Sequence, residues 1–299
     1  MVDLGIVIVN YNTCALLRRC LHSVYASAGD FTFDVSVVDN ASSDGSAEMV
    51  VSEFPQVRLI VNTDNMGYPH ANNQGLKAFG FGTDGAHSAA PSFALLLNPD
   101  TELPPDGIAE MLGFMAGHPD AGMAGPKLIR PDGSLDLACR RSFPTPEISF
   151  YRMVGLSRLF PRSQRFARYN LTHLDPDVVT EVDSVVGAFL LVRDEVISQV
   201  GLLDDQFFMY GEDLDWAYRT KQAGWKVFYN PAVTVLHVKR AATRNSPRAQ
   251  LEFYRAMEIF YHKYYSGETP RWVDAMVTCA IKILQCVAEL RAMMGLTKK

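Results

Sequence analysis

The sequence predicts an α/β protein built on a mostly parallel, doubly wound sheet. Between residues 4 and 117, short β-branched or leucine-rich runs alternate with helical periodicity about every 25 residues. The run at 95–97 is wholly apolar, as expected for a strand buried on both faces of a parallel sheet. Polar residues follow each apolar run. We therefore expect these polar clusters to meet at one edge of the sheet, where open α/β folds bind ligands.

The elements follow from local patterns. Leu17, Leu21 and Val24 recur at helical spacing after a capping residue at Asn12 or Thr13, whereas Pro131-Asp132-Gly133 is typical of a hairpin turn. The expected strands cover residues 4–9, 35–38, 57–61, 95–97, 182–192 and 233–236. The expected helices begin near Thr13, Ser43 or Asp44, Asn65, Pro104 and Glu212.

The loops after the first strands carry amides and carboxylates. Asn10, Tyr11 and Asn12 follow the first strand, and Asp39 and Asn40 follow the second. Neither GxGxxG nor GxxxxGK[ST] occurs, which disfavours a Rossmann dinucleotide site and a P-loop. Asp39 could instead accept a hydrogen bond from a nucleotide base or a ribose hydroxyl. The alternative is that Asp39 organises its own turn or caps a helix.

The run Asn98-Pro99-Asp100 ends the apolar strand at 95–97. Proline stops the strand ladder, so Asp100 is expected at the carboxyl edge of the sheet. A carboxylate there suits a divalent cation, which in turn suits a diphosphate. The alternative is a turn that caps the next helix.

A second cluster lies near residues 187–215. Gly187-Ala188 interrupts a strand and would permit close backbone approach to a ligand. Glu212 and Asp213 open a helix, where Asp213 is expected to face the site, while Asp215 pairs with Arg219 four residues on. A carboxylate at this position could act as a general base, or Glu212 and Asp213 could be a capping pair without chemistry.

His237 leaves the last strand, on the same edge as Asp100. A metal or phosphate contact and a purely structural role are both open for it. Lys239, Arg240 and Arg244, which follow, could neutralise a leaving diphosphate.

Composition sets limits on partners and location. The chain has 299 residues and a net charge of -5, which argues against a nucleic-acid partner. The first apolar run is too short for a signal peptide, so a cytoplasmic protein is expected. Arginines could face an anionic acceptor, a lipid surface or only solvent; they are Arg140, Arg141, Arg152, Arg158, Arg162, Arg165 and Arg168.

The C-terminal residues 272–294 are mostly apolar but carry four charges, including Lys282 and Glu289, which disfavours a membrane span. Three arrangements stay open for this stretch: a helix lying on the inner face of the plasma membrane, packing on the body, or a homodimer interface.

Taken together, these motifs resemble an inverting family 2 glycosyltransferase of the GT-A fold, nearest to the rhamnosyltransferase-like branch. The resemblance covers residues 4–240 in the family's order. The matching stretches are IVIVNYN (6–12), VVDNASSDGS (37–46), NMGYPHANNQG (65–75), LLLNPDTEL (95–103), VVGAFLLVR (185–193) and DDQFFMYGEDLDWAYR (204–219), followed by the strand that ends in His237.

The resemblance implies roles for individual residues. Asp213 would be the general base beside Glu212, and Asp100 and His237 would lie at an Mg²⁺ or Mn²⁺ ion. Asn98 stands where a full DxD motif has its first aspartate. The implied nucleotide-sugar site comprises Asn10, Tyr11, Asn12, Asp39, Asn40, Asn65, Gly67, Asn72, Asn98, Gly187, Ala188 and Arg244.

The resemblance also implies partners and a division of the chain. The donor would be dTDP-rhamnose or a UDP-sugar, and the acceptor a glycan or polyprenyl-linked sugar in cell-surface polysaccharide synthesis. Residues 1–245 would form the GT-A domain, with a nucleotide-binding half at 1–126 and an acceptor and catalytic half at 127–245. Residues 246–299 would be a helical extension.

Two other functions compete with this interpretation. A nucleotidyltransferase also binds a nucleotide at such an edge, but it usually needs a glycine-rich loop where this chain has Asn10-Tyr11-Asn12. A catalytically inactive sugar-nucleotide-binding partner would not need Asp39, Asp100, Glu212 and Asp213 together.

Overall fold

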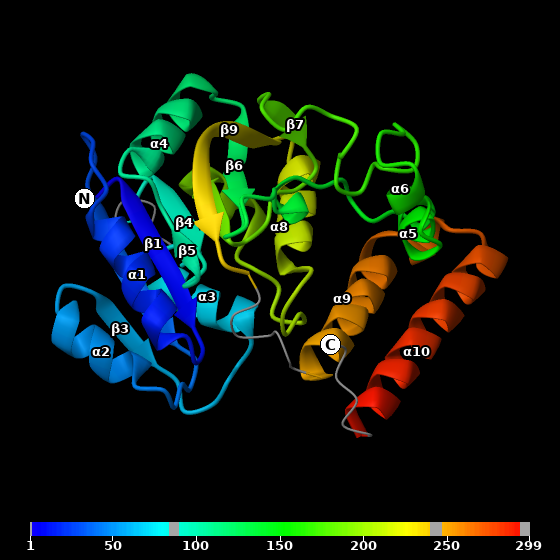
Figure 1. Ribbon diagram of the computed structural model, residues 1–299, viewed down its shortest axis with the longest axis horizontal. Coiled ribbons are helices and arrows are strands. Elements are labelled where there is room, and N and C mark those ends of the chain that lie inside the picture. The colour runs from blue at the N-terminus through cyan, green and yellow to red at the C-terminus, as the bar shows by residue number, and fades with distance from the viewer. Residues whose placement is uncertain (1, 84–89, 240–246, 294–299) are drawn as a thin grey trace.

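A computed structural model describes residues 2–83, 90–239 and 247–293, and its centre is a mixed sheet (Figure 1). Within these residues the sheet has nine strands. They are β1 (Leu4–Asn10), β2 (Phe33–Asp39), β3 (Arg58–Val61), β4 (Phe93–Leu97), β5 (Thr101–Glu102), β6 (Ala121–Ile129), β7 (Thr180–Val182), β8 (Phe189–Arg193) and β9 (Lys226–His237).

The strand order is β3-β2-β1-β4-β8-β6-β9-β5, and β7 pairs with β9. The predicted parallel pairing is confirmed for β3, β2, β1 and β4. One expectation is wrong: residues 182–192 do not form a single strand. The chain leaves β7 at the outer side of β9 and crosses to β8, which runs antiparallel between β4 and β6. Residues 183–188 make this crossing and lie between the two strands.

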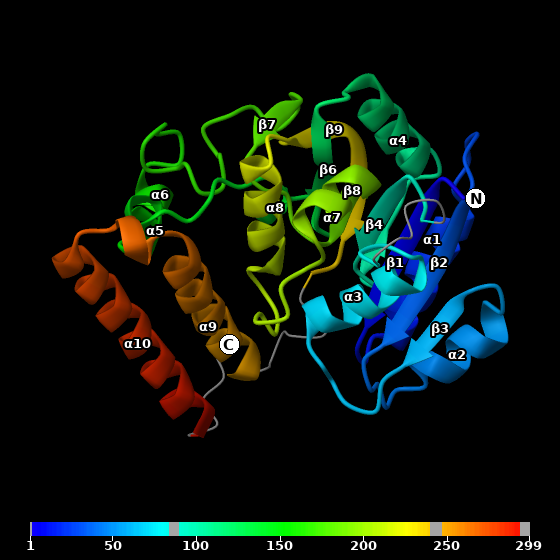
Figure 2. The ribbon, with the colours of Figure 1, turned by 180° about the vertical axis from the view of Figure 1, so that it is seen from behind.

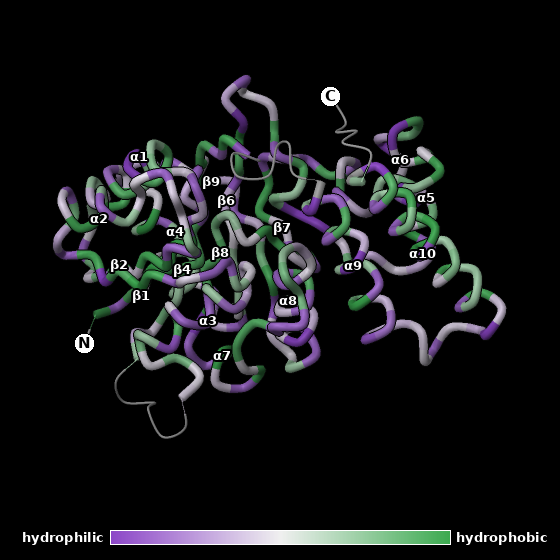
Figure 3. The backbone as a smooth tube through the Cα atoms, turned by 90° about the horizontal axis from the view of Figure 1, so that it is seen from below, coloured by the Kyte–Doolittle hydropathy of each residue, from purple (hydrophilic) through white to green (hydrophobic). Residues whose placement is uncertain are grey.

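Helices cover both faces of the sheet. Figure 3 shows α1, α2 and α4 on one face and α3, α7 and α8 on the other, and Figure 2 shows the second group from the front. The helices are α1 (Cys14–Tyr25), α2 (Ser46–Glu53), α3 (Tyr68–Ala78), α4 (Gly107–Gly117), α5 (Pro146–Met153), α6 (Leu156–Leu159), α7 (Asp194–Val200), α8 (Glu212–Gln222), α9 (Pro247–Tyr264) and α10 (Arg271–Met293), with 3₁₀ turns η1 (Leu137–Cys139) and η2 (Ser266–Glu268).

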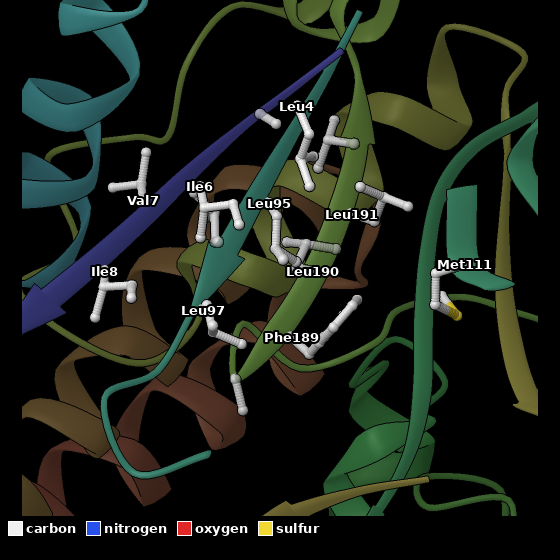
Figure 4. Close-up of a cluster of buried hydrophobic side chains, with 14 of the residues drawn as sticks. Leu4, Ile6, Val7, Ile8, Leu95, Leu97, Met111, Phe189, Leu190 and Leu191 are labelled. Carbon is white, nitrogen blue, oxygen red and sulfur yellow. The ribbon is translucent and has the colours of Figure 1, made fainter. Parts of the chain in front are cut away.

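The main core lies between the central strands and these helices. Ile6, Leu95 and Leu191 are register partners on β1, β4 and β8, and all three are buried (Figure 4). Apolar runs buried on both faces are expected in the centre of such a sheet, where alternation with polar residues is lost. This rigid centre fixes the positions of the loops at the strand ends.

The helices α9 and α10 pack against each other at the end of the molecule away from β1–β3 (Figure 1). A second apolar cluster joins α9 to α8 through Phe207, Leu214, Ala256 and Phe260. Asp215 strengthens this joint, because its Oδ1 accepts hydrogen bonds from Lys263 Nζ at 2.6 Å and Tyr264 Oη at 2.5 Å. Among the described residues, no helix is long and apolar enough to cross a membrane.

Candidate active site

The carboxyl ends of β1 and β2 bring Asn10 and Asp39 side by side. They are register partners, both are buried, and Asn10 Nδ2 donates to Asp39 Oδ2 at 3.0 Å. The other oxygen of Asp39 accepts from the backbone N–H of Ser42 at 2.8 Å, a contact within its own turn. Asp39 therefore organises the loop after β2, as the turn alternative expected, while it lies at the edge where a nucleotide was predicted.

Tyr11 and Asn12 lie in the loop just beyond Asn10. The Tyr11 side chain is exposed, and Asn12 has a left-handed backbone with φ of 52°. Asn12 is held by Ser42 and Ser43: its N–H donates to Ser42 Oγ at 2.9 Å, and its Oδ1 accepts from the Ser43 N–H at 2.8 Å. The loops after β1 and β2 thus fix each other.

Asn40 connects this loop to the segment that precedes α3. Its Nδ2 donates to Asn65 Oδ1 at 3.0 Å and to the Gly67 carbonyl at 3.2 Å. Gly67 has φ of 89° and ψ of 165°, a region that is essentially limited to glycine. A Cβ at Gly67 would come within 2.6 Å of the Phe208 carbonyl oxygen. The chain therefore needs glycine at this position.

Tyr68 forms the junction between the two halves of the site. Its hydroxyl lies 3.0 Å from both Asn98 Oδ1 and the Gly187 carbonyl. Burial and the carboxylates of Glu212, Asp213 and Asp100 raise the pKa of Tyr68. Tyr68 is thus expected to stay a neutral hydrogen-bond donor at physiological pH.

Asn72 and Ala188 support the same junction. Asn72 Nδ2 donates to the Tyr68 carbonyl at 2.9 Å, and its buried Oδ1 has no partner within the described part of the chain. The Ala188 carbonyl accepts from the Asn98 N–H at 3.0 Å. Since Asn98 Oδ1 also accepts from Tyr68, the residue at the first DxD position is committed to protein contacts.

Asp213 is buried in the first turn of α8 and has a positively charged partner. Its Oδ2 accepts from Arg141 Nη2 at 2.7 Å and from the Gly187 N–H at 3.1 Å. Burial lowers the pKa of Arg141, but the charge of Asp213 more than offsets this and leaves the pKa raised. Asp213 and Arg141 therefore form a buried ion pair. The predicted pair of Asp215 with Arg219 is also present.

Glu212 is buried next to Asp213 and lacks such a partner. Its Oε2 makes no hydrogen bond with any residue that the structure describes. Burial and the adjacent charge of Asp213 raise the pKa of Glu212 to about 8. A neutral Glu212 is the consistent state at pH 7, because Arg141 balances only one of the two carboxylates.

Asp100 and His237 face each other where β9 ends. The distance between Asp100 Oδ1 and His237 Nε2 is 3.4 Å, and both side chains are buried. On the other side of the ring, His237 Nδ1 lies 3.0 Å from Oδ2 of the buried Asp136. Burial alone would lower the pKa of His237, but Asp100 and Asp136 raise it to about 8.

The pairing of Asp136 with His237 has the form of a carboxylate–histidine–metal arrangement. The carboxylate holds Nδ1, so Nε2 is the nitrogen that is left to face Asp100 and a cation. Within the described residues no group of three or more His, Cys, Asp or Glu side chains is placed to hold a metal ion. Two protein ligands nevertheless suit Mg²⁺ or Mn²⁺ bound together with substrate phosphates, which complete the coordination shell.

Contacts link most of the predicted site residues into one continuous edge. The path runs from Asp39 and Asn40 through Gly67 and Tyr68 to Asn98 and Gly187, and then to Asp213. Asp100 lies two residues beyond Asn98, and His237, which faces it, lies at the end of β9. Arg240 and Arg244 lie outside the described residues.

Sequence reasoning missed Tyr68, Asp136 and the role of Arg141. Arg140 and Arg141 were predicted as part of a surface group, but both are buried. Arg140 donates to the carbonyls of Leu174 and Asp175, and Arg141 pairs with Asp213. Nothing in the sequence around Arg140 and Arg141 distinguished them from the exposed arginines. Tyr68 stood within a matching motif and could have been included, whereas nothing in the hairpin sequence marked Asp136.

Comparison with known proteins defines the class. Residues 3–255 match the family described as "Glycosyltransferase like family 2". The chain belongs to this family, and it is a glycosyltransferase with a GT-A fold. The family match ends within α9, so α10 lies beyond it.

Particular relatives refine the picture. The chain is 31% identical over 266 residues to "N-acetylglucosaminyl-diphospho-decaprenol L-rhamnosyltransferase" of Mycobacterium tuberculosis, covering 88% of this chain and 85% of the relative. It is 25% identical over 258 residues to "Low-salt glycan biosynthesis hexosyltransferase Agl10" of Haloferax volcanii, covering 86% and 72%. The solved mannosyltransferase PcManGT from Pyrobaculum calidifontis, in complex with GDP-Man and Mn²⁺, has a TM-score of 0.56 and 15% identity, covering 97% and 73%. That likeness supports the fold alone.

Proposed function

We propose that this glycosyltransferase transfers rhamnose, with inversion, from dTDP-rhamnose to a lipid-linked sugar during cell-surface polysaccharide synthesis. The observation that carries the proposal is the buried group formed by Glu212, Asp213 and Arg141 beside Gly187, at the same edge as Asp100 and His237. The choice of sugar and acceptor is supported by the name of the mycobacterial relative.

In this proposal Asp213 is the general base. Its Oδ1 accepts only the Leu214 N–H at 2.8 Å among the described contacts, so a lone pair is left for an acceptor hydroxyl. Arg141 and Gly187 fix the orientation of the carboxylate through Oδ2. The acceptor oxygen then attacks the anomeric carbon from the face opposite the diphosphate, and a single displacement inverts the configuration.

Glu212 has a different part in the same step. As a neutral acid with an unpartnered buried oxygen, it can donate a hydrogen bond to the sugar or the acceptor. Tyr68, also neutral, holds Asn98 and the Gly187 carbonyl in place. The base and ribose would lie at the other end of the edge. The residues that would contact them are Asp39, Asn40, Asn10, Tyr11 and Asn12, with Asn65 and Gly67 beside them.

Asp100 and His237 would hold Mg²⁺ or Mn²⁺ together with the donor diphosphate. When bound, the cation would stabilise the negative charge that develops on the leaving diphosphate. Asp136 keeps the His237 ring oriented toward Asp100. The solved structure of PcManGT, which has a similar fold, holds GDP-Man and Mn²⁺. Arg244 would contact the same phosphates.

We further propose that residues 1–245 are the catalytic domain, divided near residue 126, and that 246–299 are an extension. The protein would work at the cytoplasmic side of the membrane that carries a polyprenyl-linked acceptor. Transfer of a hexose or galactofuranose from a UDP-sugar is the second candidate reaction, and the name of the Haloferax hexosyltransferase supports hexose transfer.

The test combines donor binding and transfer. Thermal shift with a panel of nucleotide sugars is expected to give the largest stabilisation with dTDP-rhamnose, because a bound ligand raises the melting temperature by mass action. Asp213→Asn is expected to abolish transfer while donor binding stays nearly unchanged, and EDTA is expected to weaken donor binding. A fully active Asp213→Asn would remove Asp213 from the role. A preference for UDP-sugars would favour the second reaction, and donor binding without hydrolysis or transfer would favour an inactive partner.

A further inference from the structure

The segment that contains α5 and α6 presents large apolar side chains to solvent. We call residues 146–168 the α5–α6 surface. Its exposed apolar residues are Phe150, Met153, Val154, Leu159 and Phe160, and Leu159 is the most exposed of them at 69%. Single exposed apolar residues are ordinary, but a group gathered in one short segment marks an interaction site.

Arginines are interleaved with these apolar side chains. Arg152, Arg158, Arg162, Arg165 and Arg168 are all exposed, and residues 148–174 contain no aspartate or glutamate. Among the residues that the structure describes, Glu147, at the edge of the segment, is the one acid that pairs with any of them, and its partner is Arg165. The whole chain has a net charge of -5, so this positive charge is local.

The residues that flank the α5–α6 surface on either side meet beside the candidate active site. The Ser142 N–H donates to the Tyr169 carbonyl at 2.9 Å and closes the base of the segment. The preceding residue, Arg141, donates to Asp213 at 2.7 Å and is bonded to Ser184 through its backbone. A molecule held on the α5–α6 surface would therefore be fixed relative to the proposed base.

The position of the α5–α6 surface in the fold agrees with contact to a partner. Figures 1 and 3 both place α5 and α6 at the end of the molecule away from β1–β3, beside α10. Trp272, at the start of α10, is 68% exposed, and the adjacent Arg271 is exposed as well. Tryptophan is typical of membrane–water interfaces, where one side of the ring is apolar and the other is hydrated.

We propose that the α5–α6 surface docks on an anionic phospholipid bilayer. The apolar side chains enter the headgroup region and the arginines contact lipid phosphates. A second copy of the chain fits this surface less well, because five arginines and a single carboxylate, Glu147, would face their own kind across a twofold axis. The inference deepens the proposed function, since docking presents Asp213 to an acceptor that is anchored in the same bilayer.

Flotation with vesicles tests the docking without donor or acceptor. We expect the full chain to float with phosphatidylcholine vesicles that contain about 30% phosphatidylglycerol and much less with pure phosphatidylcholine. The variant Arg158→Glu/Arg162→Glu is expected to bind the anionic vesicles at least about tenfold more weakly, because neither arginine has a side-chain partner among the described contacts. The matched control Arg19→Glu/Lys77→Glu makes the same change of charge at exposed positions on α1 and α3 and is expected to bind as the wild type does.

A second variant tests the apolar contribution. Met153→Ser/Leu159→Ser keeps every charge and is expected to weaken binding that persists at high salt, since screening removes only the electrostatic part. Thermal unfolding of each variant checks that the fold is intact. Binding by the wild type to neutral and anionic vesicles alike, no binding to either, or unchanged binding by Arg158→Glu/Arg162→Glu would overturn the proposal. So would a wild-type dimer that these substitutions dissociate.

Donor binding in solution separates this inference from the proposed function. Both double variants lie outside the donor site, so their thermal shift with dTDP-rhamnose is expected to match that of the wild type. Loss of vesicle binding with intact donor binding supports the docking surface. A wild type that floats with anionic vesicles but binds no nucleotide sugar would leave the docking surface standing and refute the proposed reaction.

Discussion

At the ends of β1 and β2 the site is held by side-chain amides, whereas at the start of α8 and the end of β9 it is held by buried charges. Asn10 and Asn40 join their loops through neutral groups and one carboxylate, Asp39. On the catalytic side, Arg141 faces Asp213, and His237 lies between two aspartates. The two regions therefore respond differently to protons and ions.

The difference follows from the free energies involved. A neutral hydrogen bond contributes about 1 kcal/mol and does not depend on pH, whereas breaking a buried ion pair costs about 3–5 kcal/mol. A nucleotide base can be recognised by a fixed set of donors and acceptors. A reaction that moves a proton and separates charge needs groups whose charges are balanced by neighbours.

The largest effect is expected for the ion pair. Arg141→Met would leave the Asp213 carboxylate buried and unpaired, so the free energy of unfolding is expected to fall by about 3–5 kcal/mol. Urea denaturation of Arg141→Met, Asp213→Asn and the double variant forms a mutant cycle, and the double variant is expected to lose less than the sum. Arg18→Met is the control, since its exposed pair with Glu53 is expected to contribute about 0–1 kcal/mol. A small cost for Arg141→Met would show that the pair does not hold the catalytic side.

Glu212 is expected to make stability depend on pH. Its pKa of about 8 in the folded chain lies above the ordinary value of 4.5, so the folded state binds more protons than the unfolded state between these values. The free energy of unfolding therefore falls as pH rises from about 4.5 to about 8, with a slope of at most about 1.4 kcal/mol per pH unit. Urea denaturation across this range measures the slope, and Glu212→Gln is expected to reduce it. An equal slope in both proteins would place the dependence elsewhere.

On the amide side, backbone geometry is expected to matter more than charge. Gly67→Ala would place a Cβ 2.6 Å from the Phe208 carbonyl oxygen at φ of 89°, and we expect a loss of about 2–3 kcal/mol in the free energy of unfolding. Gly45→Ala is the control, because φ there is 82° but nothing lies within 4 Å of the added Cβ. It is expected to cost about 1 kcal/mol, and the cost of either variant is expected to be independent of pH. Equal costs would contradict a steric requirement at Gly67.

The smallest effect is expected for the residue behind the proposed metal ligand. Asp136→Asn weakens the hold on His237 Nδ1 and is expected to lower Mn²⁺ affinity by about 10–100-fold in the presence of a nucleoside diphosphate. Isothermal titration calorimetry measures the affinity. Asp132→Asn changes an exposed turn residue whose hydrogen bonds within the described chain go to Ser134, and it is expected to have no effect. An unchanged affinity in Asp136→Asn would mean that His237 is not a ligand or needs no orientation.

Local patterns were enough to predict the framework of the sheet and the edge at which the polar residues gather. The strand at Leu95–Leu97 lies where its apolar run indicated, between β1 and β8, and α8 begins at Glu212 as the capping pattern indicated. The convergence of Asn40, Gly67 and Gly187 follows from the order of the strands in the sheet. Short apolar runs followed by polar residues indicate these strands in the sequence. These features depend on contacts close in sequence or on a general rule for parallel sheets.

What sequence could not supply depends on pairing between distant residues. Val182 pairs with β9 and Phe189 pairs with β4, so the two residues belong to different strands. The local sequence pattern indicates neither pairing. Arg141 and Asp136 likewise acquire their roles from Asp213 and His237, which lie 72 and 101 residues away along the chain. The local sequence does not distinguish an arginine that neutralises a buried acid from an arginine that faces solvent.

The position of β8 has a consequence for how the chain is made. The free side of β4 gains its partner only when Phe93 meets Arg193, after most of the chain has left the ribosome. Until then the apolar strand Leu95–Leu97 has an open edge, the kind of feature that promotes aggregation during synthesis. Slow production at low temperature, or a chaperone that covers this edge, should therefore raise the yield of soluble chain more than changes at the surface would.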